Sequence, residues 1–190
     1  FQGFRGDIYV KEAVIPEGAS IIPKSQFFGC RSLEKVYLPE SVSGIEDYAF
    51  ADCHVLKVWE SMEKLSLKSV GISAFENCYA LEFISLPDSL TVIEGAAFAE
   101  CVSVNKLIFS DTSLLKKIGD HAFRGCRNLK EVYLPDSVEY VGVSAFRDCI
   151  SLEQISVSEK IKNQPGIAEL EKNCPNARIR FREVNSVEKE

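Results

Sequence analysis

The sequence predicts an α/β solenoid, a curved right-handed stack of similar coils with a parallel sheet on the concave face and short helical or 3₁₀ turns on the convex face. Two observations predict it. Seven cysteines recur at gaps that alternate between 23 and 25 residues, and the residues around them keep the same register. Regular spacing in this range is typical of stacked repeats, in which each coil buries its apolar side against its neighbours.

Composition narrows the class of protein. The chain has 190 residues, 46% of them hydrophobic, and a net charge of −6. This apolar fraction is ordinary for a globular protein and excludes wholesale disorder. No apolar run reaches the ~18 residues that a membrane helix requires, and a mildly acidic chain without basic clusters is a poor candidate for nucleic-acid binding.

The repeat is defined by three rows of buried positions. Each of the first six cysteines has a phenylalanine three residues before it, five of these phenylalanines follow an alanine, and an aliphatic residue comes three after each of the six cysteines. The cysteine row is Cys30, Cys53, Cys78, Cys101, Cys126, Cys149 and Cys174. The phenylalanine row is Phe27, Phe50, Phe75, Phe98, Phe123 and Phe146. We expect both rows to form the structural core.

Each repeat has a short strand and an outer segment. Val36 and Leu38 alternate with outward positions, which indicates a strand, and Pro39 ends it because proline cannot donate to a sheet. The stretch Ile45–Cys53 is too short for a stable independent helix, so we expect one helical or 3₁₀ turn there. Single glycines such as Gly119 and Gly142 are interpreted as turn positions.

The motif Cys-x-x-Leu-x-x-Val-x-Leu-Pro-x-Ser-Val-x-x-Ile-x-x-x-Ala-Phe-x-x-Cys resembles the BspA-like, treponemal-class leucine-rich repeat. The resemblance covers about residues 7–157 and departs at Trp59-Glu60-Ser61 and after Val157. Residues 1–3 are interpreted as an expression-tag remnant and residues 4–181 as one leucine-rich-repeat domain of about seven 23/25-residue repeats. Within that domain, 158–181 form a degenerate cap, and 182–190 follow it as a polar tail.

The resemblance implies a non-enzymatic protein-binding module. Members of this family are typically secreted or surface-attached proteins of host-associated bacteria and some protists, and they are implicated in adhesion to matrix proteins such as fibronectin and fibrinogen. An extracellular or cell-surface location is therefore expected. The alternative is an intracellular scaffold or adaptor of the same architecture, which unpaired thiols and the missing N-glycosylation sequons would favour.

The cysteine spacing argues against metal and disulfide chemistry. Structural zinc sites use ligands two to four residues apart, whereas the nearest cysteines here are 23 apart. Disulfides between adjacent coils are sterically conceivable, but the count is odd and every cysteine occupies the same apolar register. We therefore expect a column of buried reduced thiols that pack as small hydrophobic side chains, with no metal.

No catalytic site or cofactor is expected. The two histidines, His54 and His121, stand at different registers and nearly three repeats apart, whereas a nucleophile and its base must converge within hydrogen-bonding reach. His121 occupies a position filled by tyrosine, serine or alanine in other repeats, which indicates an outer surface. No glycine-rich phosphate-binding loop follows a strand.

The outward positions of the strands are the remaining candidates for function. The residue types at these positions differ from repeat to repeat, whereas the core rows keep the same residue types. This is expected when the core sets the scaffold and the surface residues are not constrained by packing. Exposed aromatic residues among charges are typical of recognition patches; scattered surface hydrophobes without a role and a dimer contact are the alternatives. The candidate partner-binding residues are Tyr37, Val58, Phe83, Lys106, Ile108, Lys130 and Tyr133.

Overall fold

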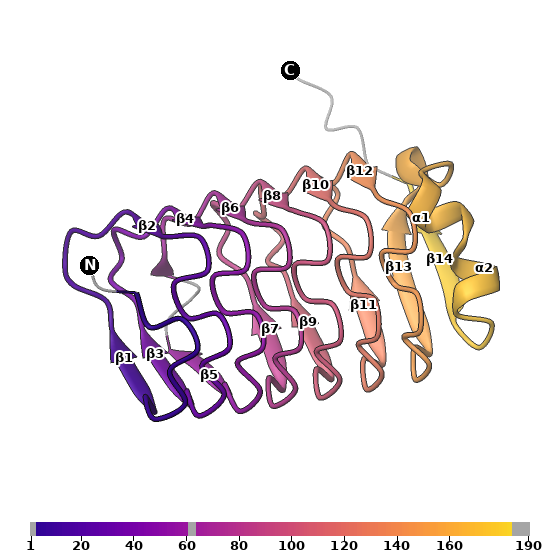
Figure 1. Cartoon of the computed structure of the whole chain (residues 1–190). Coiled ribbons are helices and arrows are strands. Elements are labelled where there is room, and N and C mark those ends of the chain that lie inside the picture. Colours follow the sequence, from indigo (N-terminus) through magenta and orange to yellow (C-terminus); the bar gives the residue numbers. More distant parts are fainter. Residues whose placement is uncertain (1–2, 61–63, 184–190) are drawn as a thin grey trace, which may run out of the picture.

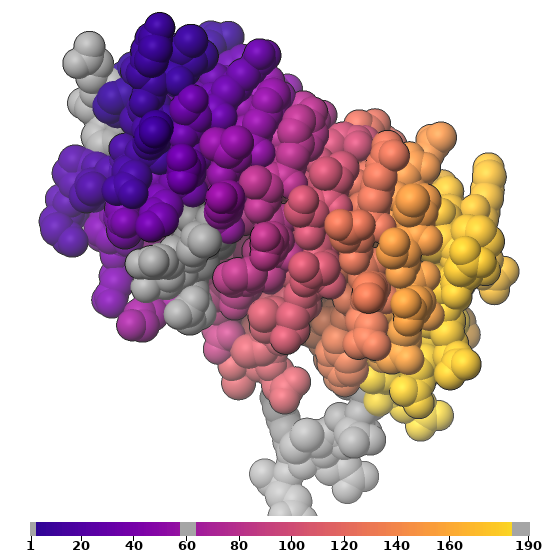
Figure 2. Space-filling view, turned by 90° about the horizontal axis from the view of Figure 1, so that it is seen from below, coloured from indigo at the N-terminus to yellow at the C-terminus, as the bar shows by residue number. Residues whose placement is uncertain are grey.

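The predicted solenoid is confirmed. The computed structural model describes residues 3–60 and 64–183, and for residues 58–60 it describes the backbone only. The chain winds through successive rungs from the N-terminal to the C-terminal end (Figure 1), and each rung forms its own band across the surface in the space-filling view (Figure 2). Each rung therefore packs against its immediate neighbours in the sequence, as in other repeat proteins.

One side of every rung is a strand. In β1, β3, β7, β9 and β11 the central residue is a buried aliphatic side chain, and in β13 Ile155 and Val157 are buried. These strands pair in parallel, because each enters its rung from the same side. They form two sheets, β1-β3-β5 and β7-β9-β11-β13-β14, which separate where the sequence departs from the motif at Trp59-Glu60-Ser61. The strands are β1 Glu12–Val14, β3 Lys35–Tyr37, β5 Val58–Glu60, β7 Phe83–Ser85, β9 Lys106–Ile108, β11 Glu131–Tyr133, β13 Gln154–Ser158 and β14 Arg178–Arg182.

A third sheet, which the sequence analysis did not foresee, runs through six rungs. Its strands have two residues each, and in each strand the second residue is a buried aliphatic side chain. This is the Ser-Val-x-x-Ile part of the motif, where the chain is extended only briefly before it turns. The strands are β2 Ile21–Ile22, β4 Gly44–Ile45, β6 Ser69–Val70, β8 Val92–Ile93, β10 Lys117–Ile118 and β12 Tyr140–Val141.

The convex segments of the regular rungs are runs of β-turns, so the expected helical or 3₁₀ turn is wrong there. Within one rung, the Ala51 N–H donates to the Tyr48 carbonyl at 3.2 Å, whereas the Phe50 N–H donates to the Ala74 carbonyl of the next rung at 2.8 Å. Tyr48 and Asp52 have positive φ values of 57° and 60°, which interrupts a right-handed helix. Alternate amides are thus available for bonds between rungs.

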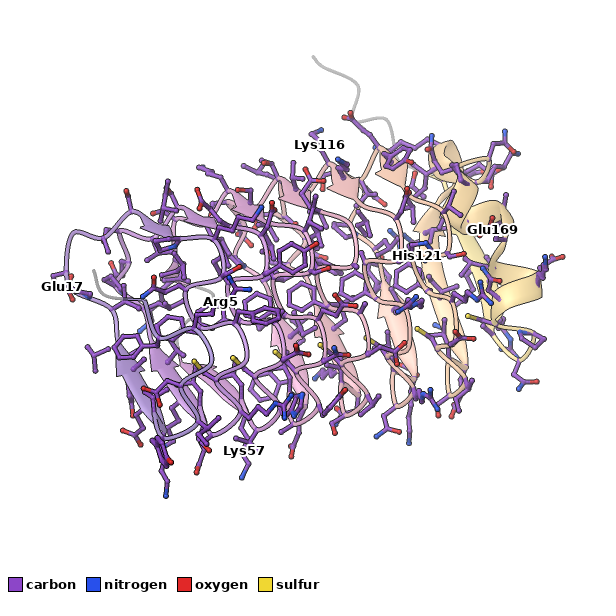
Figure 3. The ribbon with its side chains drawn as sticks, viewed as in Figure 1. Arg5, Glu17, Lys57, Lys116, His121 and Glu169 are labelled. Carbon is purple, nitrogen blue, oxygen red and sulfur yellow. The ribbon has the colours of Figure 1, made fainter. Side chains whose placement is uncertain are left out.

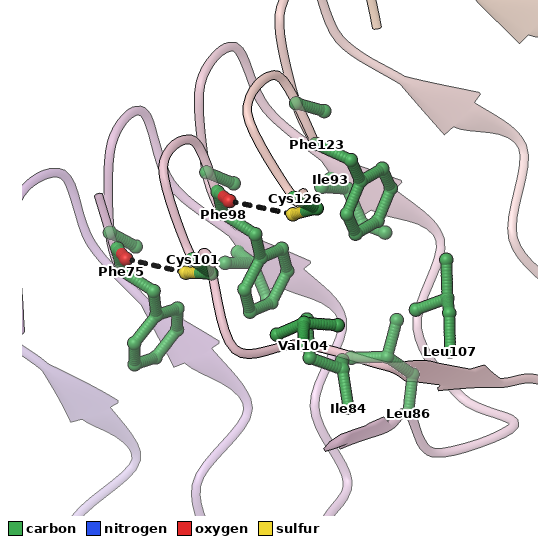
Figure 4. Packing of buried hydrophobic residues seen from close by; sticks show 14 of the residues in the cluster. Phe75, Ile84, Leu86, Ile93, Phe98, Cys101, Val104, Leu107, Phe123 and Cys126 are labelled. Atoms are coloured by element: carbon green, nitrogen blue, oxygen red, sulfur yellow. Dashed lines mark hydrogen bonds between the residues drawn. The ribbon is translucent and has the colours of Figure 1, made fainter. Parts of the chain in front are cut away.

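The core is a continuous column along the solenoid axis. The phenylalanine rings stack in parallel, with centroids 5.2 Å apart for Phe75 and Phe98 and 5.5 Å apart for Phe98 and Phe123. Beside them the cysteine thiols donate to the preceding rung: Cys101 to the Phe75 carbonyl at 3.1 Å and Cys126 to the Phe98 carbonyl at 3.4 Å (Figure 4). The sulfur atoms form one row along the molecule (Figure 3).

Gly119 and Gly142 are turn positions, as expected, because the N–H groups of Ala122 and Ala145 donate to their carbonyls at 3.3 Å. These glycines also allow close packing between rungs. Neither Gly119 nor Gly142 has a positive φ. A Cβ atom at Gly119 would lie 2.6 Å from the backbone nitrogen of Gly95 in the preceding rung. A side chain at this position would therefore push two rungs apart.

The last rung differs from the others because it contains helices that lie entirely within the described residues. The elements are the 3₁₀ helix η2 Glu159–Ile161 and the short helices α1 Pro165–Ala168 and α2 Leu170–Asn173. Strand β14 follows and pairs in parallel with β13. At the other end, Phe4 continues the aromatic stack, with its ring centroid 5.6 Å from that of Phe27.

Candidate functional site

The solenoid divides its side chains into buried rows and a sheet face. We define the sheet face as the outward-pointing positions on the long strands and in the residues that immediately precede them. The cysteine and phenylalanine rows from Phe27 to Cys174 are buried, with at most 3% of any side chain exposed. Packing fixes those rows, whereas the core does not dictate the residues on the sheet face.

Three of the candidate apolar residues gather on adjacent strands of the five-stranded sheet. Phe83 on β7 pairs with Lys106 on β9, and Ile108 lies two residues further along the same strand. Lys106 pairs in turn with Glu131 on β11, so Tyr133 occupies the position on β11 that matches Ile108. Phe83 is 43% exposed and Tyr133 is 56% exposed, while Ile108 is half-buried.

Charged side chains border these three residues. Lys106 and Lys130 are exposed, and Glu131 is exposed beside them. No salt bridge ties either lysine to a carboxylate in the described part of the chain. An apolar centre with a charged, solvated rim is the usual composition of a protein-binding patch.

Tyr37 and Val58 lie in the other sheet. Tyr37 ends β3 and is half-buried, and Lys35 on the same strand pairs with Val58 on β5. The side chain of Val58 lies outside the described residues. The sheet break between β5 and β7 therefore separates these two candidates from the group formed by Phe83, Ile108 and Tyr133.

One functional contact escaped the sequence analysis. The Arg182 guanidinium lies over the Tyr133 ring, with its Cζ 3.8 Å from the ring centroid. It donates to Asp136 Oδ1 at 2.7 Å, to the Leu134 carbonyl at 2.6 Å and to Ser156 Oγ at 2.9 Å. Arg182 is the last residue of β14, whereas the sequence analysis placed it first in the polar tail. Arg182 and Asp136 are 46 residues apart in the sequence, so no local sequence pattern indicates this contact.

The edge of the sheet face carries a carboxylate held by hydroxyl groups. Asp88 follows the proline that ends the β7 repeat, and its carboxylate accepts hydrogen bonds from the hydroxyl groups of Ser110 and Thr112 in the next rung. These two hydrogen bonds hold the pKa of Asp88 below its usual value. Both hydroxyls lie in a loop of a 25-residue repeat, so the longer repeat here contributes a contact between rungs.

The thiols are structural and unreactive in the folded chain. All seven cysteines are free and buried. Burial raises the pKa of the Cys30 thiol and of the Cys174 thiol to about 11, and it raises the pKa of the interior thiols further. A thiol that stays protonated is a poor nucleophile and a poor metal ligand. No group of three or more histidine, cysteine, aspartate or glutamate side chains within residues 3–60 and 64–183 could hold a metal ion.

The histidines are not arranged for catalysis. His54 stacks on Tyr79 of the next rung, with ring centroids 4.7 Å apart, and its Nε2 lies 3.9 Å from Asp52 Oδ1. His121 belongs to a different rung, where it is half-buried at a position of positive φ rather than fully solvated. No cysteine thiol joins either histidine, because the thiols bond to backbone carbonyl groups.

Comparison with known proteins assigns the family. The model of the BspA type leucine rich repeat region matches residues 2–113 and 59–168, in six copies. No match to a curated protein was found. In the described residues, no helix combines the length and the apolar composition needed to cross a membrane.

Three solved bacterial structures have the same fold. The leucine rich repeat protein of Treponema pallidum is 27% identical, with a TM-score of 0.60 over 92% of this chain and 70% of that chain. The pneumococcal vaccine antigen PcpA is 26% identical, with a TM-score of 0.66 over 83% and 43%. A leucine rich cell surface protein of Faecalibacterium prausnitzii, at 19% identity and a TM-score of 0.57 over 96% and 62%, supports the fold alone.

The chain spans less than two thirds of two of these three proteins. It repeats the family's motif in the register of its buried rows, and the family model covers most of its length. The chain belongs to the BspA type leucine rich repeat family.

Proposed function

We propose that the chain is a non-enzymatic protein-binding module that contacts its partner through the sheet face. The observation that carries this proposal is the grouping of Phe83, Ile108 and Tyr133 on adjacent strands, where the core does not require them. Large apolar and aromatic side chains that remain partly exposed on a rigid scaffold are the usual anchors of protein interfaces. Leucine-rich repeat proteins generally bind other proteins, which agrees with this use of the face.

The finer proposal is that the module belongs to a secreted or surface-attached protein that binds host or matrix proteins. PcpA, at 26% identity, is named a vaccine antigen, and this name supports a surface location. The free cysteines do not argue for the intracellular alternative. Their burial keeps them protonated and closed to oxidants, so they can persist in an oxidising compartment.

Binding to immobilised fibronectin and fibrinogen, measured by biolayer interferometry, tests the proposal. Phe83→Ser/Ile108→Ser removes two anchors, and we expect at least about a tenfold loss of affinity, equivalent to about 1.4 kcal/mol. The matched control is Ile72→Ser/Val143→Ser, which removes two side chains that are 44% and 40% exposed, close to the 43% of Phe83, from the convex segments of two other rungs. Circular dichroism establishes that both variants fold.

The expected result is saturable binding of the wild-type chain and of the control to at least one of the two proteins. Equal affinities for wild type and the sheet-face variant would remove this patch as the site. Loss of binding only in the control would move the site to the convex side. A wild-type chain that binds neither protein would contradict the matrix-binding proposal.

A further inference from the structure

A four-residue unit, tyrosine, leucine, proline and an acidic residue, occurs twice in the chain. It is Tyr37-Leu38-Pro39-Glu40 after β3 and Tyr133-Leu134-Pro135-Asp136 after β11. In both copies the tyrosine ends a long strand on the sheet face, and the proline turns the chain outward before the carboxylate. The two units thus occupy the same place in their rungs.

The second copy shows what such a unit binds. The Arg182 guanidinium stacks on the Tyr133 ring at 3.8 Å and donates to the Asp136 carboxylate at 2.7 Å and to the Leu134 carbonyl at 2.6 Å. The Arg182 side chain is only 20% exposed there. A planar guanidinium suits this place because it can stack on an aromatic ring while its edge donates to two acceptors.

The first copy has no such occupant in the described part of the chain. Tyr37 is half-buried and Glu40 is exposed, and neither side chain makes a hydrogen bond, an ion pair or a cation–π contact with any described residue. The strand neighbour of Tyr37 is Glu60, whereas that of Tyr133 is Ser156. The backbone register therefore places a second acidic residue beside the first copy.

The surrounding charge favours a cation. An acidic residue stands ten positions after each of the first six cysteines in the sequence, and the whole chain has a net charge of −6. Among the described residues these are Glu40, Asp88, Asp111, Asp136 and Glu159. Asp136 pairs with Arg182 and Glu159 with Lys162, whereas Glu40 forms no ion pair with a described residue. Such a field attracts basic partners.

We propose that Tyr37 and Glu40 form a docking position for an arginine side chain of a protein partner. The proposal rests on the proposed function, because it assigns a chemistry to the same sheet face. The arginine stacks on the Tyr37 ring and pairs with the Glu40 carboxylate, as Arg182 does within the chain at Tyr133 and Asp136. Arginine is preferred to lysine because the compact ammonium group cannot stack and donate in parallel.

A titration with N-acetyl-arginine amide, followed by NMR through the Tyr37 ring signals, tests the proposal directly. We expect saturable shifts at Tyr37, with several-fold weaker binding of N-acetyl-lysine amide. Glu40→Gln should weaken the arginine affinity about tenfold, since it removes a charge-assisted hydrogen bond. Glu17→Gln is the matched control: Glu17 holds the same place one rung earlier, where Val14 replaces the tyrosine.

Arg182→Gln supplies an internal reference. In the wild-type chain Arg182 already stacks on the Tyr133 ring and pairs with Asp136, so the Tyr133 ring signals should respond little to N-acetyl-arginine amide. In Arg182→Gln the uncovered Tyr133 should respond as Tyr37 does. A response at Tyr133 of this variant without one at Tyr37 would overturn the proposal, as would equal responses of Tyr37 to the arginine and lysine probes, or no effect of Glu40→Gln.

Two further outcomes separate this inference from the proposed function and from self-association. Phe83→Ser/Ile108→Ser should leave the response of Tyr37 to arginine unchanged, so a failure of the matrix-binding proposal would not register in this titration. Dimerisation that depends on chain concentration and is lost in Glu40→Gln would assign the position to an arginine of a second copy. That outcome would overturn the assignment to a separate partner.

Discussion

The stacked phenylalanine rings predict at which position along the solenoid a Phe→Ala substitution lowers the free energy of unfolding most. Phe98 is completely buried and stacks on two rings, at 5.2 and 5.5 Å, so Phe98→Ala leaves an enclosed cavity. Truncations of this kind cost about 3–5 kcal/mol. Phe4 is 36% exposed and stacks on one ring at 5.6 Å at the open end of the column, so Phe4→Ala leaves no enclosed cavity and should cost about 1–2 kcal/mol.

Urea unfolding followed by far-ultraviolet circular dichroism measures both costs. With a slope of about 2 kcal/mol per molar urea, the midpoint should fall by about 2 M for Phe98→Ala and by less than about 1 M for Phe4→Ala. If Phe98→Ala does not fold, Phe98→Leu should still cost more than Phe4→Leu. Equal losses at the two positions, or a loss below about 1 kcal/mol at Phe98, would refute a column in which each ring is enclosed by its neighbours.

The remaining predictions concern the thiols, the close-packed glycines and the cap. The pKa of each thiol is higher in the folded chain than its unfolded value of 9.0, so the thiols of the unfolded chain ionise first. The free energy of unfolding should therefore not change through the thiols below pH 9, and it should fall by up to about 1.4 kcal/mol per pH unit for each thiol as the pH rises from 9 to the folded pKa, which is about 11 for Cys30 and Cys174. Urea unfolding at a series of pH values measures this fall. Gly119→Ala should destabilise the chain by more than about 1 kcal/mol, because the new Cβ would lie 2.6 Å from the Gly95 nitrogen, and an unchanged thermal midpoint would contradict that packing. Arg182→Gln should lower the free energy of unfolding by about 1–2 kcal/mol, because it removes the stack on Tyr133 and the charged hydrogen bonds. Hydrogen exchange at the amides of β14 should become faster first. Unchanged exchange there would show that this contact does not hold the cap.

The repeat unit could be predicted because the same physical requirement recurs in every rung. Phe98 and Cys101 fill the same position in their rung as Phe75 and Cys78 fill in the preceding rung. The sequence therefore repeats these residue types, and the register can be derived without a structure. The parallel strands follow as well, since each rung enters its strand from the same side. The family resemblance depends on these same buried positions.

The convex segment could not be predicted because its conformation is decided between rungs. Tyr48 is a poor residue for positive φ and Ala96 is no better, yet both adopt it. The bonds that their rungs make with the next rung outweigh the local preference of about 1–2 kcal/mol. The packing role of Gly119 could not be predicted for the same reason: what excludes a side chain there is the backbone of Gly95, which is distant in the sequence.

The sheet face was predicted as a set of residues but not as a surface. The register placed Phe83, Ile108 and Tyr133 at outward positions, and the structure places them on adjacent strands. The separation of Tyr37 from this group depends on the sheet break after β5. The sequence marks that place by its departure from the motif at Trp59-Glu60-Ser61, but the motif alone does not show that strand pairing ends there. The acidic residues ten positions after each of the first six cysteines, by contrast, could have been found by counting along the sequence.

Native-state hydrogen exchange at the phenylalanine amides is the most direct measurement of the stacking of rungs. The N–H groups of Phe50, Phe75 and Phe98 each donate to a carbonyl of the next rung, at 2.8, 2.7 and 2.8 Å. Stacking predicts that these amides exchange only through unfolding that separates whole rungs, with free energies near the global value for the central rungs. Exchange of the Phe98 amide as fast as that of the exposed Asp111 amide would show that the rungs are not held together in this way.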